Sequence, residues 1–88
     1  MTWRIEFTER AEKDLRRLDR PVQKRIIALL REVEQLDDPR SRGKGYTGNL
    51  AGLWGYRTGP WRIVTDIHDD RLVIVALHVG HRSTVYDD

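Results

Sequence analysis

The sequence predicts an α+β protein with the element order β-α-α-β-β-β, in which an N-terminal helical hairpin packs on one face of an antiparallel meander sheet. Three observations predict this class. Residues 2–7 alternate between polar and apolar side chains, residues 22–36 repeat apolar side chains every three or four positions, and residues 53–79 contain three strand-like runs separated by turns. With 88 residues, 39% of them hydrophobic, the chain is expected to form one domain over 1–88.

The first part of the chain is expected to form a strand and two helices. The alternation over residues 2–7 is that of a half-buried strand. Thr8 can then cap a short helix that ends near Leu18. Pro21 fits the first turn of a second helix, whose apolar stripe continues to Leu36. Two helices with a short link form a hairpin that must lay its apolar face on another layer.

The remainder is expected to supply that layer. Residues 40–52, rich in Gly, Ser, Asn and Arg, are predicted to be a long irregular connection. Residues 53–57 and 61–68 are predicted to form a β-hairpin, and residues 72–79, apolar on both faces, a central strand. Val85-Tyr86 is expected to be a terminal extension. Because the helices cover one face of the sheet, the other face is expected to be open to a ligand.

Composition excludes several classes of site. The chain has no cysteine, which excludes disulfides, thiolate metal sites and cysteine nucleophiles. His78 and His81 are three residues apart on or just beyond a strand, so their side chains are expected on opposite faces and cannot easily chelate one ion. We therefore expect no metal and no cofactor. The charged N-terminus and the lack of a long apolar run predict a cytoplasmic protein with no membrane contact.

Positive charge is concentrated in the middle of the chain. Residues 1–38 carry nine basic and nine acidic side chains, whereas residues 39–65, here called the basic segment, carry five basic side chains and no acidic one. Such a segment indicates a docking site for a polyanion, and the alternative is a solvated basic loop. The five cations are Arg40, Arg42, Lys44, Arg57 and Arg62.

These side chains suit phosphate chemistry on RNA. Each guanidinium presents a planar set of donors to phosphate oxygens, and the RNA 2′-hydroxyl is an internal nucleophile, so cleavage needs no nucleophile from the protein. Each residue also has a structural alternative: Arg57 and Arg62 could pair with Asp66 or Asp70 across the hairpin, and Tyr86 could cap the core. The candidates for this chemistry are Lys44, Arg57, Arg62, Arg82 and Tyr86, with Arg40 and Arg42 as further substrate-binding cations.

Three segments together resemble the RelE/ParE toxin superfamily. The stretch from Asn49 to Arg62 is similar to that family's L-x-G-x-x-x-x-R-x-G-x-aromatic-R pattern. The stretch from His78 to Tyr86 is similar to its V-x-H-R-x-x-x-Y ending, and Phe7-Thr8-Glu9-Arg10-Ala11 to its usual start. The resemblance covers essentially the whole chain and implies the RelE-like fold.

The resemblance also implies an activity and a set of roles. It implies a toxin that enters the ribosomal A site, cleaves mRNA through the 2′-hydroxyl, and is silenced by a cognate antitoxin protein. Arg62 and Arg82 match arginines that stabilise the transition state, and Tyr86 matches a tyrosine that orients or stacks on a base. Lys44 lies in a Gly-Lys context that is seen in one branch of the family, and it could help to bind phosphate or accept a proton.

One departure leaves the general base open. Well-understood family members carry a lysine, credited as the general base, where this chain has Gly55. Lys44 and His81 are the remaining candidates for that base. His81 has the advantage that an imidazole titrates near neutral pH. Two rival functions also follow. The ParE branch shares the fold but inhibits DNA gyrase, and a catalytically decayed toxin would bind RNA without cleaving it.

Overall fold

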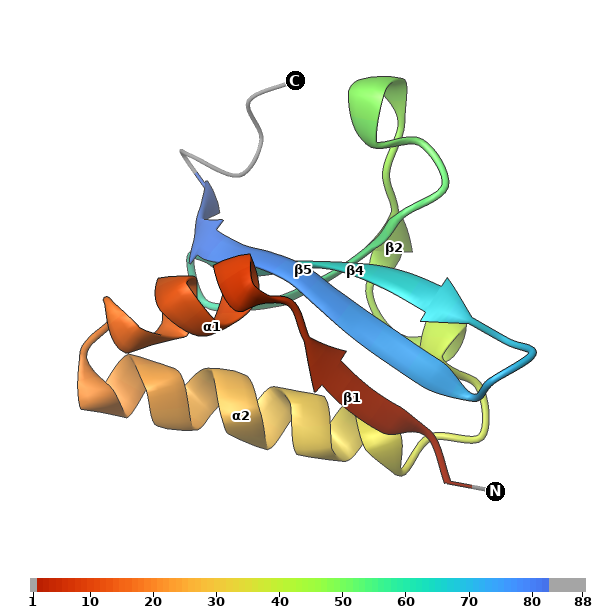
Figure 1. Ribbon diagram of the computed structural model, residues 1–88, viewed down its shortest axis with the longest axis horizontal. Helices are drawn as coiled ribbons and strands as arrows, with labels where there is room; N and C mark the ends of the chain where they lie inside the picture. Colours follow the sequence, from red (N-terminus) through yellow and green to blue (C-terminus); the bar gives the residue numbers. More distant parts are fainter. Residues whose placement is uncertain (1, 83–88) are drawn as a thin grey trace.

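The computed structural model describes residues 2–82, and it contains two helices and a five-stranded sheet (Figure 1). The elements are β1 (Arg4–Phe7), α1 (Glu9–Arg16), α2 (Arg20–Glu34), η1 (Pro39–Ser41), β2 (Lys44–Gly45), η2 (Gly48–Leu50), β3 (Trp54–Thr58), β4 (Trp61–His68) and β5 (Val73–His81), where η denotes a short 3-10 helix. The α+β class is confirmed. The expected extension at Val85-Tyr86 lies outside the described residues. Within residues 2–82, neither helix is long and apolar enough to span a membrane.

The helices begin where local chemistry predicts. The Thr8 hydroxyl oxygen accepts a hydrogen bond from the Ala11 amide at 3.1 Å, which satisfies a donor that the helix leaves unpaired in its first turn. The same hydroxyl donates to the Leu77 carbonyl oxygen at 3.1 Å, so the cap also ties α1 to β5. Pro21 lies in the first turn of α2. The apolar stripe of α2 buries four side chains, those of Ile26, Leu29, Leu30 and Val33.

The sheet differs from the expected meander at one edge. Its strand order is β1-β5-β4-β3-β2, and β3, β4 and β5 follow one another antiparallel as predicted. β1 instead pairs parallel with β5, with Arg4 opposite Val73 and Phe7 opposite Ala76. The prediction of a purely antiparallel sheet was therefore wrong. A parallel neighbour needs a long connection, and the two helices together with β2, β3 and β4 supply it.

The connection predicted to be irregular contains a fifth strand. β2 pairs antiparallel with β3, with Lys44 opposite Gly55 and Gly45 opposite Trp54. Gly43, just before β2, has a φ of +75°, and an added Cβ atom there would lie 2.1 Å from the Gly55 carbonyl oxygen. Only glycine lets the chain approach β3 this closely.

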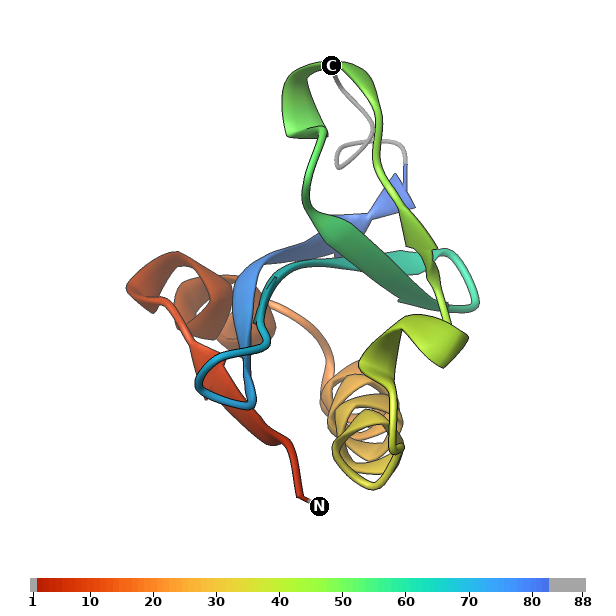
Figure 2. The ribbon, with the colours of Figure 1, turned by 90° about the vertical axis from the view of Figure 1, so that its right-hand side faces the viewer.

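The hydrophobic core lies between the sheet and the helices. It includes Tyr56, Ile63 and Val79 from the strands, packed with Ile26 and Val33 of α2. Figure 2 shows α2 end-on beneath the sheet, while the segment that carries β2 and η2 rises on the opposite side. The prediction that the helices pack on one face is confirmed.

Candidate functional site

The register of β2, β3 and β4 gathers basic side chains on one face of the sheet. Lys44 is directly opposite Gly55, and Arg57 is directly opposite Arg62. Gly55 and Arg57 are two residues apart on β3, so their side-chain positions point to the same face. Lys44, Arg57 and Arg62 therefore share the face that turns away from the buried Tyr56 and Ile63.

A pocket of about 350 Å³ connects these residues. Arg62 reaches it from β4 with a buried Nε atom, and Arg42 enters from the loop before β2, where its Nη1 atom lies 2.7 Å from Glu32 Oε1. Four cations from the basic segment thus meet in a single concavity. The lining residues are Leu29, Arg42, Gly43, Lys44, Tyr46, Gly55, Tyr56, Arg57 and Arg62.

The pocket also contains Tyr46, which the sequence analysis did not single out. The Tyr46 amide donates to the Leu53 carbonyl oxygen at 3.0 Å, which extends the β2–β3 ladder by one residue. A Cβ atom added at Gly55 would lie 2.6 Å from the Tyr46 hydroxyl oxygen and 2.7 Å from its Cζ atom. The phenol therefore occupies the space that a side chain at position 55 would need. Its place two residues after Lys44 was the available signal, but a two-residue strand leaves no visible periodicity.

Arg82 lies at the same end of the sheet as Arg57 and Arg62. The Arg82 amide donates to the Pro60 carbonyl oxygen at 2.8 Å, in the turn that joins β3 to β4. Gly80, two residues earlier, is directly opposite Arg62. The fold thus brings the backbone of Arg82, which is distant in the sequence, to the end of the β3–β4 hairpin that carries Arg57 and Arg62. Tyr86, the other candidate from the C-terminal motif, lies outside the described residues.

His81 is on the opposite face from the pocket cations. It pairs with Trp61 in the register, one position away from the Gly80–Arg62 pair, and neighbouring strand residues point to opposite faces. The Trp61 and His81 rings pack edge to face with their centroids 5.4 Å apart. His78 points away from His81, as their spacing predicts, and its Nδ1 atom lies 2.6 Å from Asp14 Oδ2 on α1. The structure does not bring His81 together with Lys44.

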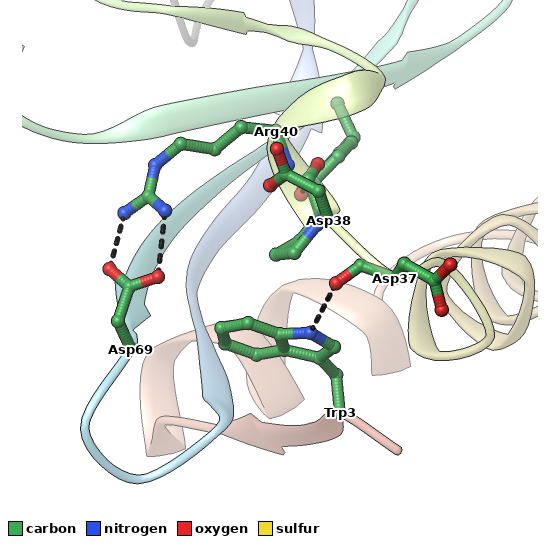
Figure 3. Close-up of polar contacts among 7 residues, drawn as sticks. Trp3, Asp37, Asp38, Arg40 and Asp69 are labelled. Atoms are coloured by element: carbon green, nitrogen blue, oxygen red, sulfur yellow. Dashed lines mark hydrogen bonds and ion pairs between the residues drawn. The ribbon is translucent and has the colours of Figure 1, made fainter. Parts of the chain in front are cut away.

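Arg40 lies outside the pocket. Its two terminal nitrogens each donate to an Asp69 carboxylate oxygen at 2.9 Å, which ties η1 to the turn between β4 and β5 (Figure 3). This bond raises the pKa of Arg40 and lowers the pKa of Asp69. Asp38, whose side chain accepts from the Arg40 amide at 2.9 Å, caps the same turn. The geometry gives Arg40 a structural role.

Asp66, which was expected as a possible partner of Arg57 or Arg62, lies beside His68. Asp66 Oδ2 is 3.1 Å from His68 Nε2 on the same strand. Among residues 2–82, no three His, Asp or Glu side chains gather in a group that could hold a metal ion. What the pocket offers chemically is a set of cationic and hydroxyl donors around an open space, which suits an anion with several oxygens.

Known proteins resemble this chain in both sequence and fold. The family described as "ParE toxin of type II toxin-antitoxin system, parDE" matches residues 5–86. Toxin RelG of Mycobacterium tuberculosis is 33% identical over 89 residues, which cover 98% of each chain. The RelBE2 toxin–antitoxin complex of M. tuberculosis contains a chain with 32% identity and a TM-score of 0.71, covering 93% of this chain and 100% of that one. A double mutant of E. coli toxin RelE in the free state has 25% identity and a TM-score of 0.77, covering 97% of this chain and 88% of that one.

The fold and the matches define a toxin of a type II toxin–antitoxin system. The chain belongs to the RelE/ParE toxin superfamily, since the family match spans most of its length and a toxin relative exceeds 30% identity over nearly all of it. The resemblance that the three sequence segments indicate is confirmed.

Proposed function

We propose that this toxin is a ribosome-dependent mRNA endoribonuclease. The observation that carries the proposal is the Arg57–Arg62 pair, two like charges directly opposite each other on adjacent strands. Like charges directly opposite each other on neighbouring strands are unfavourable, and a bound anion close to both side chains would reduce that cost. A phosphodiester in the pocket would supply that charge, and it would give both guanidinium groups and Lys44 an acceptor.

The chemistry needs no cofactor. The 2′-oxygen of the substrate forms a new bond to the adjacent phosphorus while the bond from phosphorus to the 5′-oxygen breaks, which yields a 2′,3′-cyclic phosphate and a 5′-hydroxyl. One proton leaves the 2′-hydroxyl and one reaches the 5′-oxygen. Arg62 and Arg82 are proposed to stabilise the charge that develops on the phosphate, and Lys44 to bind the phosphate or accept the first proton. Arg42 and Arg57 are proposed to hold the RNA backbone, and Tyr86 a base.

The proposed partners follow from the relatives. Several structural neighbours are toxins in complex with an antitoxin, including the RelBE complexes of M. tuberculosis and E. coli. We propose that a cognate antitoxin neutralises Arg57, Arg62 or Arg82 in the same way that a phosphate would, by charge pairing. The ribosomal A site and its mRNA are the proposed targets, and the cytoplasm is the proposed compartment.

The decisive experiment is cleavage of mRNA on programmed ribosomes. Purified toxin is added to ribosomes stalled with a defined codon in the A site, and the mRNA ends are mapped by primer extension. We expect cuts within that codon, and far weaker cutting of the same mRNA without ribosomes. Arg62→Ala is the inactive control. Uncut mRNA with the wild-type toxin would contradict the proposal.

Inhibition of DNA gyrase is the second candidate function, because the matching family is described as ParE toxin. A supercoiling assay with purified gyrase distinguishes it from the nuclease. Loss of supercoiling with intact mRNA would identify a gyrase inhibitor. Ribosome or RNA binding with neither effect would identify a decayed RNA-binding toxin.

A further inference from the structure

We propose that the Tyr46 hydroxyl is a phosphate-contacting donor of the cationic pocket and binds a nonbridging oxygen of the RNA phosphodiester. The inference deepens the proposed function, and it rests on that function for the identity of the ligand as RNA. Tyr46 is an uncharged polar residue of the pocket lining, and its hydroxyl and ring edge lie directly against Gly55.

Backbone pairing sets the direction of Tyr46. Lys44 is opposite Gly55, and the bond from the Tyr46 amide to the Leu53 carbonyl continues that ladder. Tyr46 is two residues from Lys44, so both side chains leave the strand on the same face. The ring is half-buried, and its hydroxyl end extends back over β3 to Gly55.

The absence of a side chain at position 55 is what admits the hydroxyl. An added Cβ atom would lie 2.6 Å from the hydroxyl oxygen, a separation that non-bonded atoms of this kind do not tolerate. Gly55 is opposite Lys44 and two residues before Arg57, which is opposite Arg62. The hydroxyl of Tyr46, a residue that follows β2, therefore lies over Gly55 of β3, between Lys44 and the Arg57–Arg62 pair.

This position suits a neutral donor. Cations supply the net charge that a phosphodiester needs, but more cations at the same point would repel one another. A phenol adds a directional O–H donor without adding charge, and it has few rotatable bonds to order when the ligand binds. In the reaction, the negative charge on the nonbridging oxygens grows, so a preorganised donor aimed at one of them lowers the barrier.

Phosphate binding by the isolated toxin tests the inference without requiring cleavage. Inorganic phosphate is titrated into wild type and Tyr46→Phe, and the amide shifts of Lys44, Gly55 and Arg57 are followed by NMR. Tyr46→Phe keeps the ring and removes only the donor, so we expect phosphate affinity to fall about two- to tenfold, the range of one neutral hydrogen bond. Equal affinity of the two proteins would overturn the proposal, as would the absence of phosphate-dependent shifts at these residues in wild type.

Three further variants test the position of the phenol and separate the contribution of its hydroxyl from that of its ring. Gly55→Ala leaves the phenol chemically intact but displaces it, and we expect a loss of phosphate affinity similar to that of Tyr46→Phe. Gly45→Ala is the matched control, because its Cβ atom would lie on the opposite face, 3.3 Å from the Trp54 ring. Full phosphate affinity in Tyr46→Phe with a loss only in Tyr46→Leu would assign the contact to the ring and overturn the role of the hydroxyl.

Single-turnover cleavage of ribosome-bound mRNA then tests the role in the reaction. We expect Tyr46→Phe to slow cleavage tenfold or more while its melting temperature stays that of wild type. A wild-type rate in Tyr46→Phe would overturn the inference and leave the nuclease function standing. A wild-type protein that cuts no mRNA would instead contradict the proposed function, and the phosphate titration would still decide whether the hydroxyl contacts phosphate.

Discussion

The Tyr56 hydroxyl donates a buried hydrogen bond to the Pro39 carbonyl oxygen at 2.7 Å. It joins the middle of β3 to the start of η1, seventeen residues earlier in the chain. Burial of the phenol raises the pKa of Tyr56 well above its usual range, so the group stays a neutral donor at all physiological pH values. The bond fixes the segment that leads to Arg42 and Lys44 against the sheet.

We therefore expect Tyr56→Phe to lower the free energy of unfolding by about 1–3 kcal/mol, because the Pro39 carbonyl loses its donor in a buried setting. Urea denaturation followed by tryptophan fluorescence measures the change. Tyr46→Phe is the matched control. Because Tyr46 is only half-buried, loss of its hydroxyl should leave the free energy of unfolding within about 0.5 kcal/mol of wild type. Equal stability of Tyr56→Phe and wild type would show that the bond contributes nothing to the fold.

The two facing arginines are predicted to differ in role. Replacing Arg57 tests its effect on the free energy of unfolding, and replacing Arg62 tests its effect on the rate of cleavage. Arg57 is exposed and opposite a like charge, so Arg57→Ala should leave the free energy of unfolding unchanged or slightly higher. Arg62→Ala should raise the barrier to cleavage by about 2–4 kcal/mol, which is roughly a hundredfold or more in rate. The measurement is single-turnover cleavage on ribosomes.

Arg71→Ala is the matched control for both arginine variants, because Arg71 is an exposed arginine whose Nη2 atom lies 3.8 Å from Glu6 Oε1, at the edge of the sheet formed by β1. Its cleavage rate should equal that of wild type. A rate for Arg62→Ala within threefold of wild type would argue against a role of Arg62 in the transition state.

The general base should be found on the pocket face. Lys44 lines the pocket, whereas His81 lies on the other face against Trp61. We expect Lys44→Ala to slow single-turnover cleavage and to change its pH dependence, and His81→Ala to retain the wild-type pH profile. Lys44→Arg separates the two possible contributions of the lysine, because arginine keeps the charge and is a poor proton acceptor at neutral pH. A loss of the acid limb of the profile in His81→Ala would reverse this assignment.

Asp69 should titrate below its ordinary range. The hydrogen bond from Arg40 lowers the pKa of Asp69 in the folded protein, so the stabilisation from this pair is present above the unfolded value of about 3.9 and is lost as the pH falls through the folded pKa. Arg40→Ala should return the pKa of Asp69 to its ordinary value, as measured by NMR of the carboxyl carbon. Arg71→Ala, near the same turn, should leave the Asp69 titration where it is in wild type. An unchanged Asp69 pKa in Arg40→Ala would show that the guanidinium is not its cause.

Binding to ribosomes should depend strongly on salt. Each phosphate contact releases counterions, so the logarithm of affinity should fall linearly with the logarithm of salt concentration. Replacing Lys44 by Ala should reduce that slope by about one contact. Filter binding or sedimentation at several salt concentrations gives the slope, and an affinity independent of salt would contradict docking through the basic segment.

Much of the fold follows from local patterns. The apolar stripe of α2, the Thr8 cap and the β3–β4 hairpin are where the sequence predicts them, because side-chain periodicity and capping act over a few residues. The parallel pairing of β1, in contrast, does not follow from a local pattern. Whether a strand joins a sheet parallel or antiparallel depends on how the whole connection folds, and no pattern within residues 4–7 records it.

The candidate site was likewise predicted in part from the sequence and decided in part by the tertiary structure. The sequence alone concentrates Arg42, Lys44, Arg57 and Arg62 in one acid-free segment, which predicts a cationic surface. Pairing of β2 with β3 and of β3 with β4 decides that these four side chains meet in one pocket. The same segment contains Arg40, which the structure instead ties to Asp69.

The sequence by itself therefore determined the family, the helices, the central hairpin and the supply of positive charge, all of which depend on residue type and short spacing. Only the tertiary structure decided that Tyr46 covers Gly55 and that His81 turns to the face opposite Arg62. The reason is that strand alternation assigns a side chain to one of two faces, but only the register with a neighbouring strand says which residues share that face.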